Sequence, residues 1–285
     1  MHNEAQIAFW NGPGGDNWVT HNRLLEEFLH PLGMAARDLM DWDEGHRVLD
    51  IGCGCGNQTL SLARSLSDSS EILGIDVSEP MLALARQQLD ACDPRPEPKV
   101  SFLNADASRF DFEAGRFDRL YSRFGVMFFD DPVNAFANLR RSASLDAQLG
   151  FICWQKPDEN PFMTVPSRAA MRYLPAPEPA PPGAPGPFAF ADRDHVVSIL
   201  NSAGFSGIDI EPLHCDLNLG AGQAFERVVR ELLDIGPVAG MLREADPGLR
   251  EPVMSAVSEA LAPHFSAQSG LSMPGAFWLV RAVNR

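Results

Sequence analysis

The chain has 285 residues, a hydrophobic fraction of 45% and a formal net charge of −15. This length suffices for one large domain or for a core domain with a cap. The acidity disfavours nucleic acid as a partner because it repels a phosphate backbone. No run approaches the roughly 20 apolar residues that a membrane span needs. With no basic, apolar leader at the N-terminus, we expect a cytoplasmic protein without a membrane span.

The first informative element is residues 48–56, an apolar run followed by glycines at alternate positions. Such a string predicts a buried strand that turns tightly and passes into a helix, here over 59–66, whose free N–H groups face the turn. We expect a small polar molecule to lie across it. The glycines concerned are Gly52, Gly54 and Gly56.

Short apolar strands then alternate with amphipathic helices as far as residue 154. Strands alternating with helices of this length predict a parallel sheet that is covered on both faces. The expected strands are 72–76, 100–103, 117–122 and 149–154, and the expected helices are 78–89 and 131–137.

A segment rich in Pro and Ala, 175–187, interrupts this alternation. Beyond it we expect a capped helix at 192–203, a strand from 208, two amphipathic helices at 225–233 and 253–261, and a last strand at 277–283. The fold class predicted is α/β, a Rossmann-like doubly wound sheet of seven strands. The sheet is mostly parallel with an antiparallel last strand, and helical insertions form a cap.

Three acids, Asp50, Asp76 and Asp106, stand at the ends of three successive predicted strands. Ligands of open α/β sheets bind outside these strand ends, where the strand order reverses. Asp76 is placed to accept the hydroxyls of a ribose. Asp106 is placed to meet an adenine amino group, or alternatively to cap the turn that follows it.

The spacing of the glycines separates two cofactor classes. A dinucleotide fingerprint has its third glycine where Asn57 stands. Asp50 would face a pyrophosphate unfavourably, but it suits the cationic amino-acid group of S-adenosylmethionine. The pattern therefore favours S-adenosylmethionine over NAD, and a nicotinamide oxidoreductase is the disfavoured reading.

Residues 46–156 resemble the class I S-adenosylmethionine-dependent methyltransferases, and are similar to the small-molecule, menaquinone/ubiquinone-biosynthesis type. The resemblance is carried by 48–56, by 74–78 with Met81 and Leu82, by 104–107, and by Phe117 with Asp118. It implies that S-adenosylmethionine is the cofactor. The residues it assigns to cofactor binding are Asp50, Gly52, Gly54, Gly56, Asp76, Val77, Met81, Asp106, Ala107 and Ser122.

On this basis we divide the chain into a core with insertions. The divisions are an N-terminal helical lid at 1–45, the S-adenosylmethionine-binding core at 46–156, a Pro-rich cap insertion at 157–190, more core at 191–215, a helical cap insertion at 216–270 and a final core strand at 271–285. The opening segment also resembles the N-terminal lid of uncharacterised bacterial members.

Aromatic residues flank the expected position of the methyl group and favour an apolar or aromatic substrate. Trp10 and Trp18 are either core anchors or parts of the lid, and Arg123 binds a substrate carboxylate or pairs with a surface acid. The expected substrate-binding residues are Trp10, Trp18, Arg123, Phe124 and Trp154. The chain lacks the histidine pair of the quinone-type enzymes after the fourth strand, which disfavours a quinone precursor.

Methyl transfer needs alignment, and a general base only when the nucleophile keeps its proton. His21, His195, His214 and Tyr173 are candidate bases, and no catalytic residue is assigned. The five cysteines predict reduced thiols and no metal site, since no second cluster completes Cys53 and Cys55. The function expected is methyl transfer to a small metabolite by a monomer or homodimer. The alternative is an S-adenosylmethionine-binding protein that transfers no methyl group.

Overall fold

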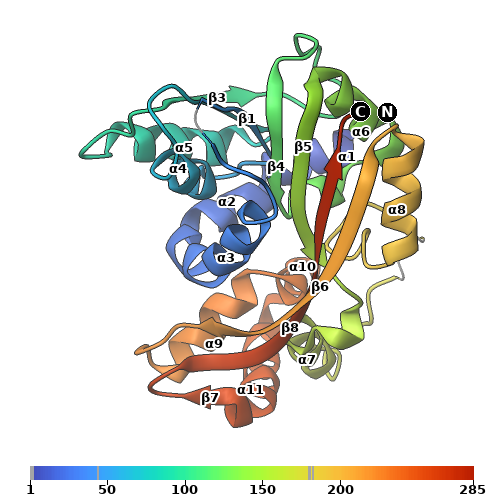
Figure 1. Cartoon of the computed structure of the whole chain (residues 1–285). Helices are drawn as coiled ribbons and strands as arrows, with labels where there is room; N and C mark the ends of the chain where they lie inside the picture. The colour runs from blue at the N-terminus through green and yellow to red at the C-terminus, as the bar shows by residue number, and fades with distance from the viewer. Residues whose placement is uncertain (1–2, 44, 179–180, 182) are drawn as a thin grey trace.

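The computed structural model describes residues 3–43, 45–178, 181 and 183–285. One central sheet runs through it, with helices on both sides, α3 and α8 on opposite ones (Figure 1). Its strand order is β3-β2-β1-β4-β5-β8-β6, with the short β7 paired to β8. Strands β1 to β5 pair in parallel, and β8 is antiparallel to both β5 and β6. The predicted fold class is therefore confirmed.

The strand order reverses beside β1, which has β2 on one side and β4 on the other. A ligand crevice is expected outside the carboxyl ends of the strands at such a point. The strands are β1 (Arg47–Ile51), β2 (Glu71–Asp76), β3 (Lys99–Asn104), β4 (Phe117–Arg123), β5 (Ala143–Trp154), β6 (Ser206–Leu219), β7 (Phe265–Ser266) and β8 (Gly270–Val283).

Some of the helices begin at a residue whose side chain caps the first turn. Ser78 accepts a hydrogen bond from the Met81 N–H at the start of α5, and Asp192 does the same for α8 from the N–H groups of Asp194 and His195. The α-helices are α1 (Glu4–Trp10), α2 (Pro13–Thr20), α3 (Asn22–Arg37), α4 (Asn57–Ala63), α5 (Glu79–Asp90), α6 (Pro132–Ser142), α7 (Pro161–Ala170), α8 (Arg193–Ser202), α9 (Phe225–Asp234), α10 (Pro237–Arg243) and α11 (Arg250–Leu261).

The last two long strands depart from the sequence prediction. Strands β6 and β8 are each 14 residues long and stay paired from Leu213 opposite Phe277 to Leu219 opposite Leu271. Residues 216–219, expected to be cap, are therefore strand, and β8 begins at Gly270, at the boundary expected for the final core strand. Apolar and polar residues alternate along 216–219, a period of two that indicates a half-buried strand.

This long hairpin carries a helical cap beyond the rest of the sheet. Helices α7, α9, α10 and α11 gather around its outer half (Figure 1). The region 216–270 thus contains α10 in addition to the two helices that the sequence predicted. Residues 179–180 and 182 of the predicted Pro-rich insertion lie outside the described residues.

Candidate active site

A cavity of about 580 Å³ opens beyond the carboxyl ends of β1, β2 and β4. The N-terminal helices, the glycine turn, α7 and the α9–α10 connection contribute to its wall. It brings together most of the residues that the sequence singles out. Those lining it are Trp10, Trp18, Asp50, Gly52, Gly54, Asp76, Val77, Met81, Asp106, Ala107, Arg123, Phe124 and Trp154.

The glycine turn needs glycine for two separate reasons. Gly52 has a φ of +70°, and a Cβ there would lie 2.7 Å from the Gly125 Cα. Gly54 has a φ of +55°, and its Cβ would lie 2.8 Å from the Met81 methyl. Other residues rarely adopt this backbone conformation and would clash here, so the turn leaves its backbone open to the cavity.

Two residues expected to contact the cofactor do not line this cavity. A Cβ on Gly56 would lie 2.7 Å from the Ala85 Cβ, so this glycine allows close helix packing. Ser122 is fully buried, donates to the Ile51 carbonyl at 2.8 Å and accepts from the Gly125 N–H at 3.2 Å. The geometry gives both residues a structural role in holding the turn.

Asp50 is buried at the end of β1. Its Oδ2 accepts a hydrogen bond of 2.6 Å from the Thr59 hydroxyl. Burial raises the pKa of Asp50 to about 6, against the lowering effects of Thr59 and of the Arg123 guanidinium. A cation placed beside Asp50 would stabilise the charged carboxylate.

Asp76 accepts hydrogen bonds from two backbone N–H groups across the crevice. These come from Gly54 and Ser78, each at 2.8 Å. Burial raises the pKa of Asp76, and these hydrogen bonds oppose the shift. Asp76 therefore joins the glycine turn of β1 to the loop after β2, at the edge of the cavity.

Asp106 caps a turn and also lines the cavity. Its Oδ1 accepts from the N–H and the hydroxyl of Ser108, at 2.9 and 2.6 Å, so it caps the turn that follows β3. Its Oδ2 lies 3.0 Å from Arg109 Nε. The residue also lines the cavity, so the capping role and a place at the cavity coexist.

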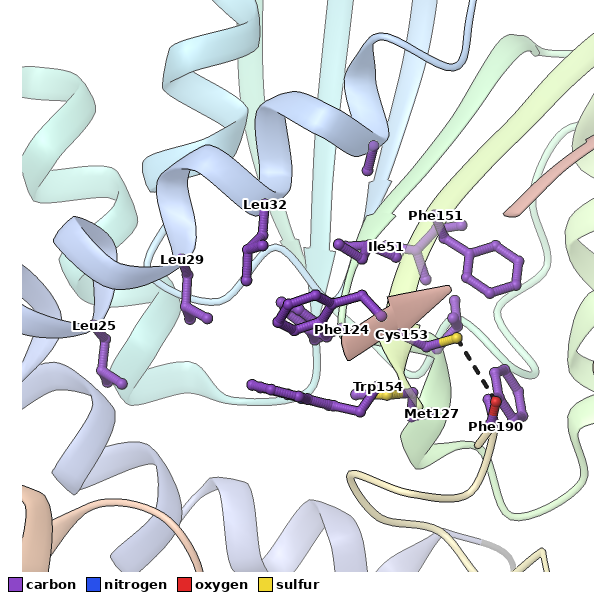
Figure 2. Packing of buried hydrophobic residues seen from close by; sticks show 14 of the residues in the cluster. Leu25, Leu29, Leu32, Ile51, Phe124, Met127, Phe151, Cys153, Trp154 and Phe190 are labelled. Atoms are coloured by element: carbon purple, nitrogen blue, oxygen red, sulfur yellow. Dashed lines mark hydrogen bonds between the residues drawn. The ribbon is translucent and has the colours of Figure 1, made fainter. Parts of the chain in front are cut away.

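An aromatic wall bounds the far part of the cavity. Phe124 stacks on Trp154 with centroids 5.2 Å apart, and Figure 2 shows the two rings one above the other, facing Leu25 and Leu29 of α3. Phe28 stacks on Phe162 at 4.8 Å. Phe124 has a φ of +62°, which is strained for a bulky residue and marks a constrained position.

Arg123 is not in a surface ion pair. Its Nη2 lies 2.8 Å from Glu26 Oε2, and the two side chains are 12% and 20% exposed. Glu26 lies on α3 and also lines the cavity. Sequence reasoning missed Glu26, Phe28 and Phe162, because on an amphipathic helix such residues look like surface or core.

The N-terminal helices are bonded to both sides of the cavity. The Ser78 hydroxyl donates to the Trp10 carbonyl at 2.5 Å. The Asn11 side chain donates to the Val77 carbonyl at 2.8 Å and accepts from the Glu79 N–H at 3.0 Å. No local pattern in the sequence points to Asn11, because its partners are distant along the chain.

A second contact ties the same helices to the cap. The Asn17 side chain donates to the Asp234 carbonyl at 2.7 Å. The rings of Trp10 and Trp18 meet edge to face at 6.0 Å, and both line the cavity. The two tryptophans therefore form part of the cavity wall.

None of the four candidate bases lines the cavity in the part of the chain that the structure describes. The His21 Nε2 lies 3.8 Å from the carboxylate of the lining residue Asp234. No group of three or more His, Cys, Asp or Glu among the described residues could hold a metal ion. The described helices include none long and apolar enough to cross a membrane.

The family model described as methyltransferase domain matches residues 48–144, from β1 to the start of β5. The matched segment is a methyltransferase domain. This confirms the resemblance to class I S-adenosylmethionine-dependent methyltransferases over residues 48–144. The glycine turn, Asp50, Asp76 and Asp106 all fall within it.

Two curated relatives each match about two fifths of the chain. Aklanonic acid methyltransferase DauC of Streptomyces sp. (strain C5) is 33% identical over 118 residues, 41% of this chain and 52% of that protein. The 2-phytyl-1,4-naphtoquinone methyltransferase of Trichormus variabilis is 28% identical over 120 residues, 42% and 52% of the two chains. The chain thus spans about half the length of these relatives.

Solved structures share the fold over most of the chain. The YcgJ protein from Bacillus subtilis has a TM-score of 0.55 at 15% identity, over 90% of this chain and 98% of its own. The cyclase SpnF has a TM-score of 0.53 at 16% identity, over 94% of each chain. At these identities the likeness concerns the fold alone.

Proposed function

We propose that the protein binds S-adenosylmethionine and transfers its methyl group to a small apolar or aromatic metabolite. The observation that carries this proposal is the continuity of the cavity, which runs from the three acids of the methyltransferase domain to the aromatic wall of Phe124 and Trp154. A cofactor at one end and an acceptor at the other would share one enclosed space.

The side chains at the first end suit the parts of the cofactor. We assign its methionine part to Asp50 with the backbone of Gly52 and Gly54, and its ribose to Asp76. Val77 and Met81 would contact the faces of the adenine, and Asp106 with Ala107 its edge. Trp10, Trp18, Phe124 and Trp154 would contact the acceptor.

Bound S-adenosylmethionine supplies a methyl group on a positively charged sulfur. The chain contributes alignment of the acceptor atom with that methyl group, and exclusion of water by the aromatic wall and the N-terminal helices. Trp154 is 4% exposed and is held by Phe124 and Phe277, with centroids at 5.2 and 4.7 Å. A rigid flat wall of this kind orients a flat acceptor.

The names of the relatives support an aromatic acceptor. One is named for aklanonic acid and the other for a phytyl naphtoquinone. The acceptor of this chain is proposed by class only, because the matches to the two relatives cover only 41% and 42% of this chain. A cytoplasmic location and a monomeric or homodimeric state stay predictions.

The test is incubation with methyl-labelled S-adenosylmethionine and a panel of hydroxylated naphthalenes, anthraquinones and aliphatic alcohols. We expect labelled product from aromatic members of the panel, and its loss in Asp76→Ala. Binding of S-adenosylhomocysteine without labelled product from the panel or from a bacterial small-molecule extract would contradict methyl transfer.

That second outcome would support the alternative of a protein that binds the cofactor without transferring methyl. Two observations keep this alternative in view. No candidate base lines the cavity among the described residues, and a protein named as a cyclase shares the fold. Turnover of an acceptor into an unlabelled product would identify such an activity.

A further inference from the structure

We propose that Glu26 and Arg123 recognise the amino-acid end of S-adenosylmethionine, Arg123 its carboxylate and Glu26 its ammonium. The inference rests on the proposed function and names residues of the same cavity. It moves Arg123 from the acceptor to the cofactor, and it adds a residue of the N-terminal helices to the cofactor site.

The pair is a partly buried ion pair in a cavity wall. Arg123 ends β4 and Glu26 lies on α3, so the pair joins the core to the N-terminal helices. Removing two charges from water costs free energy that their mutual attraction often does not recover. Binding of a ligand that contacts both charges would explain why a pair with this cost lies in the cavity wall.

The Glu26–Arg123 pair is near enough to the glycine turn to act on the charges there. The Arg123 guanidinium lowers the pKa values of both Asp50 and Cys55, and the Glu26 carboxylate raises them. The Arg123 Nη1 is 3.5 Å from the Oε1 of Gln58, which lies in the first turn of α4. These groups surround the end of the cavity assigned to the methionine part.

The charges of the pair complement those of an amino acid. A free amino-acid end carries one ammonium and one carboxylate, and the pair presents one carboxylate and one guanidinium. Arg offers a planar fork of donors that matches a carboxylate. Asp50 adds a second carboxylate near the ammonium, so neither charge of the ligand is buried without a partner.

Packing holds both side chains in place. The His30 Nδ1 lies 3.1 Å from Glu26 Oε1. A Cβ at Gly33 of α3 would lie 2.9 Å from the Arg123 Cδ and 2.3 Å from the Gln58 Oε1. Glycine at this position lets α3 pack closely against the side chains of Arg123 and Gln58. The Tyr121 hydroxyl also donates a hydrogen bond of 2.9 Å to the Gly33 carbonyl.

Two ligands separate the amino-acid end from the nucleoside in titration calorimetry. S-adenosylhomocysteine carries the amino acid, and 5′-methylthioadenosine carries the same nucleoside and sulfur without it. We expect Arg123→Gln and Glu26→Gln each to weaken S-adenosylhomocysteine about 10- to 100-fold, as for the loss of a charged hydrogen bond. Binding of 5′-methylthioadenosine should change less than about 2-fold, because its contacts are elsewhere.

The conservative variant Arg123→Lys sharpens the test, because it keeps the charge but not the fork. Its affinity for S-adenosylhomocysteine should lie between those of the wild-type protein and of Arg123→Gln. If Arg123→Gln weakens the binding of S-adenosylhomocysteine and of 5′-methylthioadenosine equally, Arg123 acts through the fold and the proposal is wrong. If it leaves both affinities unchanged, the proposal is also wrong. If the wild-type protein binds neither ligand, the proposed function itself fails.

Discussion

The two ends of the cavity are built in different ways. The proposed cofactor end comes mainly from one stretch, residues 48–107, in which each strand end brings its own motif, and only Glu26 and Arg123 are added from outside it. The acceptor end comes from α3, the ends of β4 and β5, α7 and the α9–α10 connection, which are far apart in the sequence. Local motifs therefore report the cofactor class, whereas the acceptor depends on long-range packing. Variants at each end should separate the two functions.

The largest effect is expected at the aromatic wall. Trp154→Ala should lower the free energy of unfolding by about 3–5 kcal/mol, because it leaves a cavity beside Phe124 and Phe277. Denaturant titration measures this change. Trp154→Phe keeps most of the ring and serves as the milder control.

The same variants test the separation of the two ends. Trp154→Phe should raise the KM for the acceptor while the affinity for S-adenosylhomocysteine stays within about 2-fold. A parallel loss of cofactor affinity would show that the aromatic wall also forms part of the cofactor site, and would contradict the separation of the two ends.

At the cofactor end, Asp76→Asn should weaken S-adenosylhomocysteine about 30- to 100-fold, since it removes the charged acceptor of the ribose hydroxyls. Calorimetry measures the affinity. Asp106→Asn is the matched variant and should cost less, because Asp106 is assigned a single neutral amino group whereas Asp76 is assigned two ribose hydroxyls. Equal losses at the two positions would contradict the assignment of the ribose to Asp76.

Asp50 links stability to pH. Its pKa is about 6 in the folded protein and has an ordinary value of 3.8. The folded state therefore holds the proton more tightly. Its contribution to stability is full below about pH 4, falls as the pH rises toward about 6, and is lost above.

Asp50→Asn removes the loss of stability that accompanies ionisation of the buried carboxyl group. We expect the variant to raise the free energy of unfolding at pH 7.5 by about 2 kcal/mol and to flatten the slope between about pH 4 and 6. It should also weaken S-adenosylhomocysteine, whose ammonium loses a carboxylate. Denaturant midpoints across pH give the first result. A variant less stable than the wild type at pH 7.5 would contradict the burial effect.

The smallest effect concerns the attachment of the N-terminal helices. Asn11→Ala removes the hydrogen bonds to Val77 and Glu79 and should cost about 1–2 kcal/mol of local stability. Hydrogen exchange in α1 and α2 should quicken, and S-adenosylhomocysteine should dissociate faster. Thr20→Ala, which removes a bond within α2, is the matched control. Identical exchange in both variants would show that Asn11 does not fasten these helices.

The sequence predicts the glycine turn and the strand ends at the cavity because the interactions that form them are local. The positive φ of Gly52 and Gly54 and the acids that end β1 to β3 follow from strand, turn and helix periodicity. Gly56 and Ser122 were assigned to cofactor contact because spacing alone does not say which way a residue faces. Both turn toward the packing behind the cavity wall.

Contacts between segments far apart along the chain, at either end of the cavity, are harder to predict. Glu26 meets Arg123 across 97 positions, and Asn17 meets Asp234 across 217. The long pairing of β6 with β8, which carries the cap, depends likewise on register between distant strands. Such contacts leave no local pattern in the sequence.

The most direct test is a crystal structure with S-adenosylhomocysteine. The account predicts the nucleoside beyond β1 and β2, with ribose hydroxyls within hydrogen-bonding distance of Asp76 and the sulfur directed toward Phe124. A nucleoside bound elsewhere, or a ribose held by other groups with Asp76 facing away, would contradict it.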